Sequence, residues 1–295
     1  MSKAALLIIN PRAGKMRGNR FLAEIISIFT DHGFDNCVYM TRHPGDGVDI
    51  CKTHAKDFNL VVAIGGDGTL NEVISGMIES GVKKPLGYIP AGSTNVFSGN
   101  LGLTPDILSA AKRIMKCSSK PMDIGRFENR YFSFIASFGA FSKTSYATPQ
   151  NAKNTLGHMA YIFEGIKEMP NIKPIHVRVE TDTQSFEDDY IFGAFSNSLT
   201  VAGILKLDKK RVDLSDGLLE ILLIKYPKNA DQFSRVLSGL NTKHYDPDII
   251  SFCSTKKATV YAPKDMDWSL DGEYAAGAEI IHVETLHNAI DFIRK

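Results

Sequence analysis

The stretch Leu60-Val-Val-Ala-Ile-Gly65-Gly66-Asp67-Gly68-Thr69-Leu70-Asn71-Glu72 joins two different sequence patterns without a linker. It opens with a continuous apolar run, typical of a buried strand, and closely spaced glycines then end that run. From Leu70 onward the apolar residues recur at the spacing of one helix face. The stretch therefore predicts a strand, a tight turn and a helix in direct succession.

This glycine-rich turn has the composition of an anion-binding site. Backbone N–H groups at the start of a helix attract anions, and glycine lets a phosphate approach the backbone closely. Asp67 would repel a phosphate unless a metal ion lay between them, so we expect a Mg²⁺-nucleotide as the ligand. A plain tight turn with a helix cap is the alternative interpretation. The phosphate-loop and dinucleotide-binding glycine motifs are missing, which argues against P-loop NTPases and Rossmann dehydrogenases.

Strand-like and helix-like segments alternate around this turn. Strands are expected over 4–9, 36–40, 60–64 and 85–89, and helices over 21–29, 70–78 and 106–115. This alternation predicts a parallel sheet covered on both faces. Two further polar turns, residues 10–15 and 90–95, also follow strands. Ligands bind beyond the carboxyl ends of parallel strands, so we expect the three turns to converge on one nucleotide site.

The pattern changes near residue 122. Strand-like segments then follow one another over 131–141, 175–181, 190–196, 218–226, 251–262 and 278–284, with helices expected over 155–169 and 229–240. We therefore predict an α/β nucleotide-binding domain over 1–122 and a largely antiparallel, strand-rich domain over 123–284. The C-terminal residues, from about 285 to 295, can return to the first domain and form part of it.

Composition restricts the class of protein further. The 295 residues carry 34 Lys+Arg against 33 Asp+Glu, a net charge of +1, so no nucleic-acid partner is expected. The four cysteines form no CxxC pair, which excludes a zinc ribbon. The apolar runs are too short for a signal peptide or a membrane-spanning helix, so a cytoplasmic protein is expected.

Several motifs together resemble one known family. They are Asn10-Pro-x-x-Gly14, the glycine-rich turn, Pro90-Ala-Gly-Ser-Thr-Asn95, Asp123-Ile-Gly-Arg126, Asp216-Gly-Leu-Leu-Glu-Ile221 and Leu270-Asp-Gly-Glu273. In this order they resemble the diacylglycerol kinase catalytic domain of soluble lipid kinases, over nearly the whole chain. That family includes bacterial diacylglycerol and phosphatidylglycerol kinases and the sphingosine and ceramide kinases. The glycine-rich element alone is less specific, because NAD kinases share it.

The resemblance implies a fold and an activity. The N-terminal α/β domain would be similar to NAD kinases and phosphofructokinases, and the C-terminal domain would be a mainly antiparallel β-sandwich that binds the lipid. ATP would lie between the two domains. With Mg²⁺, its γ-phosphate would pass to a hydroxyl of a diacylglycerol-like, phosphatidylglycerol-like or sphingoid membrane lipid. Such an enzyme would contact the membrane peripherally. An exposed strand edge could also pair with a second copy and form a homodimer.

The resemblance also assigns residues to the ATP site. They are Asn10, Pro11, Arg12, Ala13, Gly14, Thr41, Gly65, Gly66, Asp67, Gly68, Thr69, Leu70, Asn71, Glu72, Ser93 and Asn95. Asp67 would orient the catalytic Mg²⁺, and Arg12 and Lys15 could offset phosphate charge. A structural Mg²⁺ would be bound by Asp213, Asp216 and the Leu218 carbonyl, whose hard oxygen ligands suit that ion. A turn that enters a strand is the alternative interpretation of this loop.

The expected catalytic base lies in Asp271-Gly272-Glu273. A carboxylate within reach of a lipid hydroxyl can accept its proton, and by family position we expect Glu273, with Asp271 close behind. A two-residue hairpin turn built on Asp-Gly is the competing interpretation of this motif.

The chain departs from the family pattern at Val96, Phe134 and Phe141, where many members carry Asp, Asn and Asp. Two alternative functions follow. One is an NAD-kinase-like enzyme, which the motifs at 90–95 and 216–221 oppose. The other is a catalytically silent nucleotide-binding or lipid-binding regulator, which the retained Asp67, Asp216, Asp271 and Glu273 oppose.

Overall fold

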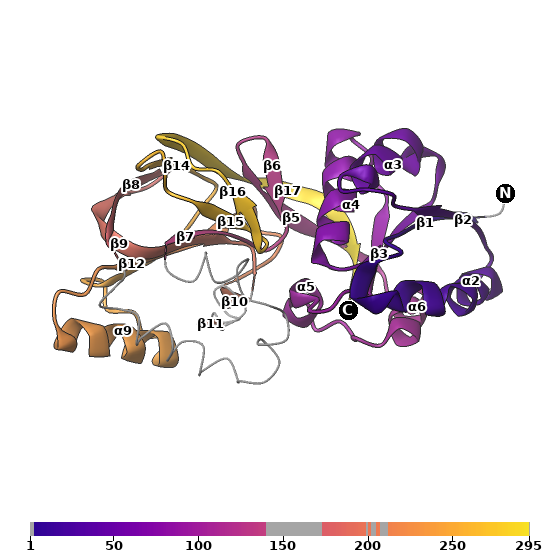
Figure 1. Ribbon diagram of the computed structural model, residues 1–295, viewed down its shortest axis with the longest axis horizontal. Helices are drawn as coiled ribbons and strands as arrows, with labels where there is room; N and C mark the ends of the chain where they lie inside the picture. The colour runs from indigo at the N-terminus through magenta and orange to yellow at the C-terminus, as the bar shows by residue number, and fades with distance from the viewer. Residues whose placement is uncertain (1–2, 140–172, 199, 202–204, 207–211, 295) are drawn as a thin grey trace. The chain divides into compact units, whose positions relative to one another are not determined.

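The computed structural model describes residues 3–139, 173–198, 200–201, 205–206 and 212–294 (Figure 1). The helix expected over 155–169 and the departure at Phe141 lie outside these residues. The chain divides into two compact units. The first comprises Met1–Met122 with Asn288–Lys295, and the second comprises Asp123–His287.

The first unit is built on a parallel sheet in the order β4-β3-β1-β2. Its strands are β1 (Lys3–Ile9), β2 (Phe34–Met40), β3 (Leu60–Gly65) and β4 (Pro85–Pro90). The end of β17 (Ile280–Ile293) runs parallel to β4 and pairs with it through Asp291 and Phe292. β3 is buried along its whole length, because helices cover both faces of the sheet.

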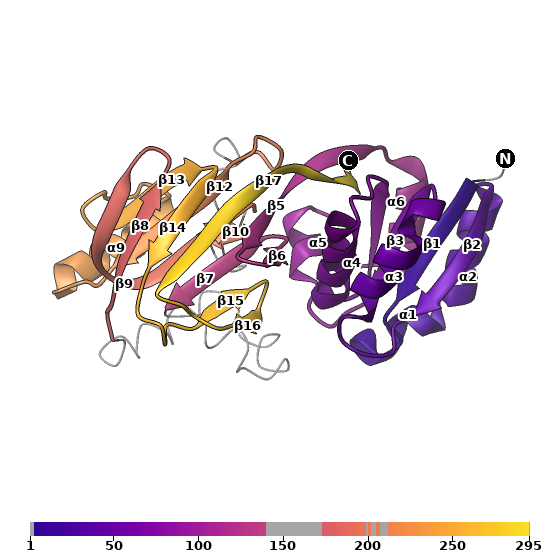
Figure 2. The same cartoon turned by 90° about the horizontal axis from the view of Figure 1, so that it is seen from above.

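Four longer helices cover this sheet. α2 (Leu22–Asp31) and α6 (Ile107–Lys116) lie on one face, and α3 (Asp46–His54) and α4 (Asp67–Glu79) lie on the other (Figures 1 and 2). Shorter helices are the 3₁₀ turns Ala13–Lys15 and Ala55–Asp57, with α1 (Arg17–Arg20) and α5 (Val96–Asn100). The predicted parallel α/β architecture is confirmed.

The second unit is strand-rich and antiparallel, as predicted. Its strands are β5 (Ser119–Phe127, which begins in the first unit), β6 (Arg130–Phe132), β7 (Ile135–Gly139), β8 (Ile175–Thr181), β9 (Ser185–Ser196), β10 (Thr200–Val201), β11 (Leu205–Lys206), β12 (Leu219–Lys225), β13 (Ile250–Thr255), β14 (Lys257–Tyr261), β15 (Trp268–Leu270) and β16 (Glu273–Ala275). The main path is β16-β15-β7-β9-β8-β14-β17, and β12 joins β9 to β13. α9 (Ala230–Thr242) begins at Asn229, whose side chain accepts the Gln232 N–H.

The core of the second unit surrounds Trp268, which is fully buried. Its ring makes edge-to-face contacts with Phe127 and Phe138, at centroid distances of 4.9 and 5.0 Å. Such aromatic pairs add to the stabilisation that comes from burial alone. These contacts bring β5, β7 and β15 together, which positions the turns that follow β6 and β15.

Several details differ from the expectation. The segment 131–141 forms two strands, β6 and β7, and β5, β15 and β16 were not among the expected strands. The segment 251–262 is not one strand but two, β13 and β14, with Lys256 between them. Helix α3 was not predicted, because its start has no local side-chain cap. The Glu72 carboxylate, distant in sequence, instead accepts the N–H groups of Gly45 and Gly47 at 2.8 and 3.0 Å. A cap supplied from another helix leaves no signal in the local sequence.

Candidate functional site

Three turns of the first unit meet at the carboxyl ends of β1, β3 and β4. The Asn10 N–H donates to the Ile64 carbonyl at 2.9 Å. The N–H groups of Ala91 and Gly92 both donate to the Gly65 carbonyl, at 2.8 and 3.1 Å. The backbone itself therefore ties the turns after the three strands together, as the sequence predicted.

Two glycines allow this close approach. Gly14 has φ +52°, and a Cβ at this position would lie 2.1 Å from the Ala91 carbonyl oxygen. A Cβ at Gly92 would lie 2.5 Å from the Gly66 Cα. Both distances are too short for any side chain, so glycine is required where the turns touch.

Asp67 joins the glycine-rich turn to helix α5. Its carboxylate oxygens accept the N–H groups of Val96 and Phe97, at 2.9 and 3.1 Å. Burial raises the pKa of Asp67, while these two hydrogen bonds act in the opposite direction. The departure at Val96 leaves this bond in place, because Asp67 contacts the backbone of Val96. The predicted role of Asp67 toward Mg²⁺ stays a prediction.

The other acidic residue of the motif, Glu72, has a similar bracing role. Its bonds to Gly45 and Gly47 cap α3 and also fix the segment that follows Thr41. The Thr41 N–H itself donates to the Ile9 carbonyl at 2.9 Å. In that segment, Asp46 accepts hydrogen bonds from the backbone and the guanidinium of Arg42. These contacts place Thr41 beside the end of β1.

Two asparagines shape the turns from within. Asn10 donates from Nδ2 to Thr69 Oγ1 at 3.3 Å, and its Oδ1 accepts the Arg12 N–H at 3.0 Å. Asn95 is buried with φ +52°, and its side chain both accepts from and donates to the backbone of Gly92, at 3.0 and 2.9 Å. Both side chains hold backbone conformations rather than pointing freely into solvent.

The remaining predicted ATP-site residues differ in exposure. Arg12, Gly68 and Ser93 are exposed, as is neighbouring Lys15, so these can meet a ligand directly. Buried or half-buried positions are occupied by Pro11, Ala13, Gly65, Leu70 and Asn71. Because the Leu70 side chain is buried within α4, only its backbone could take part in ligand binding.

The two candidate bases of the second unit have different environments. Asp271 accepts the N–H groups of Ser133, Phe134 and Ile135, at 2.6, 3.0 and 3.0 Å. The Glu273 side chain is instead 65% exposed, with the Arg130 guanidinium at 3.7 Å. Asp271 thus holds the β6–β7 turn, whereas the Glu273 side chain is open to solvent.

The hairpin interpretation of this motif is also confirmed. Leu270 pairs with Glu273 across a two-residue turn, and Asp271 and Gly272 both have positive φ, 51° and 91°. This geometry is a type I′ turn, which fixes the strand that carries Glu273. The hairpin and a catalytic role for Glu273 are therefore compatible.

The loop expected to bind a structural Mg²⁺ presents two exposed carboxylates. Asp213 Oδ1 accepts the N–H and hydroxyl of Ser215, at 3.0 and 2.9 Å, and Asp216 Oδ1 accepts the Leu218 N–H at 2.9 Å. Oδ2 of Asp213 and Oδ2 of Asp216 have no hydrogen bond to another described residue. Carboxylate oxygens of this kind suit a hard divalent ion. Within the described part of the chain, no three His, Cys, Asp or Glu side chains are grouped as metal ligands.

Two buried acids next to this loop were not predicted as site residues. Asp123 is fully buried, accepts the Gly217 N–H at 2.6 Å, and lies 3.0 Å from His287 Nδ1. Glu220 is 1% exposed, and burial, followed by the charge of Asp216, raises its pKa to about 8. Both acids stand in family motifs quoted in the sequence analysis, and these motifs were the available sequence signal.

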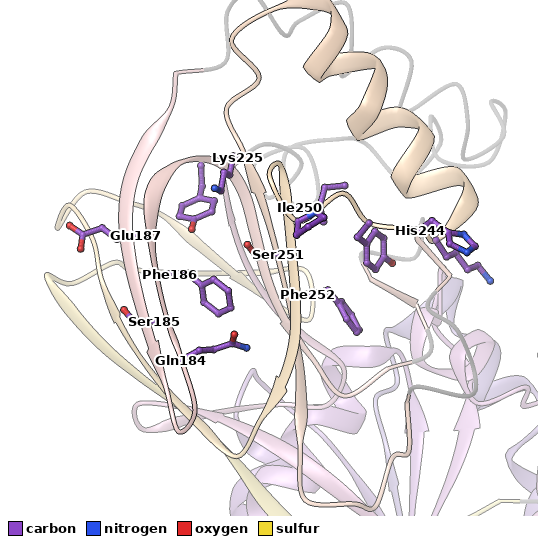
Figure 3. A pocket seen from close by; sticks show the side chains of 13 residues that line it. Gln184, Ser185, Phe186, Glu187, Lys225, His244, Ile250, Ser251 and Phe252 are labelled. Atoms are coloured by element: carbon purple, nitrogen blue, oxygen red, sulfur yellow. The ribbon is translucent and has the colours of Figure 1, made fainter.

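A separate cavity of about 640 Å³ lies in the second unit (Figure 3). It is lined by residues of β9, β13 and the segment that follows α9, including Phe186, Tyr245 and Phe252. None of the predicted site residues lines this cavity. No helix in the described ranges is long and apolar enough to cross a membrane.

Comparisons with known proteins identify the family. The diacylglycerol kinase catalytic domain matches residues 4–127. A diacylglycerol kinase of Bacillus subtilis (strain 168) is 32% identical over 275 residues, covering 92% of this chain and 90% of that protein. A diacylglycerol kinase of Staphylococcus saprophyticus is 31% identical over 281 residues, covering 93% and 90%.

Solved structures show the same fold. The crystal structure of a diacylglycerol kinase from Bacillus anthracis str. Sterne aligns with a TM-score of 0.75 at 21% identity, over 100% of this chain and 97% of that one. A second structure from that organism aligns with a TM-score of 0.80 at 24% identity, over 100% and 96%. The family match and the curated relatives define a lipid kinase. The chain belongs to the diacylglycerol kinase family.

Proposed function

We propose that this lipid kinase uses ATP and Mg²⁺ to phosphorylate a hydroxyl group of a diacylglycerol-like membrane lipid. The observation that carries the proposal is the convergence of three polar turns at the carboxyl ends of β1, β3 and β4. Glycines at such turns, together with the N-terminal end of helix α4, suit a nucleotide phosphate chain. The exposed side chains of Arg12 and Lys15 would offset the phosphate charge.

Phosphoryl transfer requires mainly alignment and charge neutralisation. ATP would supply the phosphoryl group, and Mg²⁺, when bound, would neutralise charge on the phosphate oxygens. The lipid hydroxyl oxygen forms a bond to the γ-phosphorus, the bond from that phosphorus to ADP breaks, and the hydroxyl proton passes to a carboxylate. We assign this carboxylate to Glu273, because it is exposed while Asp271 is occupied by three backbone N–H groups.

The substrate lies in a membrane, so we propose that the enzyme contacts the bilayer peripherally. Tyr274, which follows Glu273, is 53% exposed and supports this proposal. Tyrosine is an amphipathic side chain that suits the membrane–water interface. The homodimer through a strand edge of the second unit stays a prediction.

The test is transfer of radiolabelled γ-phosphate from ATP, with Mg²⁺, to separate micelles of diacylglycerol, phosphatidylglycerol, sphingoid base or ceramide. NAD serves as a further acceptor, to test the NAD-kinase alternative. We expect a labelled lipid whose formation is lost in Glu273→Gln and retained in Glu279→Gln, an exposed acid of the same unit. Labelled NAD, or no labelled lipid with any acceptor, would contradict the proposal.

A further inference from the structure

Glu220 is a buried acid whose hydrogen-bonding capacity is unmet. It lies on β12 and is 1% exposed. Apart from the N–H of Glu220 itself, neither carboxylate oxygen has a donor partner among the described residues. Buried polar groups of native proteins nearly always have a partner, and a missing one points to a bound water or ion.

The residue opposite Glu220 has the same property. Glu220 pairs with Ser196 of β9, and directly opposed residues project from the same face of a sheet. Ser196 is fully buried, and its hydroxyl has no partner in the described parts of the chain. The next residue, Asn197, donates to the carbonyls of Asp123 and Leu214, and its own Oδ1 has no partner among the residues that the structure describes. The side-chain oxygens of Ser196 on β9 and Glu220 on β12, which lack hydrogen-bond partners among the described residues, thus lie near the 213–218 loop.

The charges around Glu220 are mostly of one sign. The carboxylates of Asp216, Asp123 and Asp213 all act on it electrostatically. Asp123 accepts the Gly217 N–H and lies 3.0 Å from His287 Nδ1. Carboxylates repel one another, and a nearby cation lowers that repulsion.

We propose that Glu220 is a further anchor for a divalent cation bound at the Asp213–Leu218 loop, acting through the water of that cation. The inference rests on the proposed Mg²⁺ role of this loop and adds a buried residue to it. The proposed contact is indirect, in keeping with the finding that no three acidic side chains are grouped as metal ligands among the described residues. Mg²⁺ commonly keeps several waters when protein carboxylates bind it, and the Glu220 oxygens and Ser196 hydroxyl provide partners for such water.

The test measures Mg²⁺ binding directly and needs no catalytic activity. Full-length protein is treated with EDTA, dialysed and titrated with MgCl₂ without nucleotide, and the rise in melting temperature gives an apparent Kd. We expect Glu220→Gln to weaken Mg²⁺ binding about ten-fold or more, the range typical of residues that support metal ligands. Asp216→Asn should weaken it at least as much. Glu180→Gln, a half-buried acid on β8, should bind Mg²⁺ as the wild type does.

Glu220→Asp keeps the charge on a shorter side chain, so its Kd should fall between those of the wild type and Glu220→Gln. If Glu220→Gln fails to fold, Glu220→Asp takes its place in the test. Wild-type affinity in Glu220→Gln or, failing that, in Glu220→Asp would overturn the inference. Wild-type affinity in Asp216→Asn would overturn it too, because the cation would then bind elsewhere. Neither result decides the proposed function, which the Glu273→Gln transfer assay tests separately.

Discussion

The Asp67 carboxylate accepts the backbone N–H of Val96 at 2.9 Å, so the acidic residue of the glycine-rich turn caps the short helix α5. Asp271 makes an equivalent contact in the second unit, where it accepts the Phe134 N–H at 3.0 Å. Val96 and Phe134 are both positions at which the side chain departs from the family pattern. Because backbone groups make these bonds, both departures leave the anchoring of the two acids intact.

Asp67→Asn should lower the stability of the first unit. An amide has one acceptor oxygen instead of two, so one N–H of α5 loses its partner, which costs about 1–3 kcal/mol. Denaturant unfolding should show this loss. Asp57→Asn, an exposed acid of the same unit, should stay within about 0.5 kcal/mol of the wild type. Equal stability of the two variants would contradict the capping role of Asp67.

Asp271→Asn should destabilise the second unit. The carboxylate accepts three backbone N–H groups, and an amide in its place presents a donor to at least one of them. Losing a bond to a charged acceptor costs about 1.5–3 kcal/mol. Thermal unfolding should register this loss whether or not lipid or nucleotide is present. An unchanged melting temperature would show that the β6–β7 turn does not depend on Asp271.

Glu273→Gln should have the opposite profile, with a large loss of rate and little change in stability. The side chain is 65% exposed, and its Arg130 contact at 3.7 Å is a weak surface pair. Removing a general base typically lowers the rate about 100-fold or more. The measurement combines kcat for lipid phosphorylation with the melting temperature of the same sample. If Glu273→Gln kept the wild-type rate, another residue would have to be the base.

The sequence predicted the first unit well because its signals are local. Apolar runs mark β1, β3 and β4, and the glycines mark the turns that meet beyond them. Helix α3 was missed because Glu72 caps it from another helix. Glu220 stands in a quoted family motif, but the sequence could not show that it is buried opposite Ser196, because burial and cross-strand neighbours depend on the fold. The local sequence pattern therefore could not predict contacts between residues that lie far apart in the sequence.

Gly14→Ala should disrupt the contact between the first and third turns. Its Cβ would lie 2.1 Å from the Ala91 carbonyl oxygen, and φ +52° is strained for any L side chain. Gly33→Ala is the matched control, because φ is +81° there and no atom lies within 4 Å of the added Cβ. Both variants carry backbone strain, so the greater loss of stability in Gly14→Ala measures the clash. ATP binding, followed by calorimetry, should weaken in Gly14→Ala alone.

The pH dependence of stability should reveal the pair formed by Arg42 and Asp46. The Arg42 side chain and backbone N–H bind the Asp46 carboxylate and lower its pKa from 3.8 to about 2. An acid whose pKa is lower in the folded state stabilises the fold above its unfolded pKa, and this contribution is lost as the pH falls through the folded value. The wild type should therefore be more stable than Asp46→Asn above about pH 4.

That difference between the wild type and Asp46→Asn should shrink steadily as the pH falls from about 4 toward 2. Taking the difference between the two proteins removes the titration of all other carboxylates, which they share. Urea unfolding at a series of pH values measures it directly. A difference that stayed constant over this range would mean that packing of Asp46, not its charge, holds the segment between β2 and α3. A difference that grew on acidification would reverse the sign that the bonds from Arg42 require.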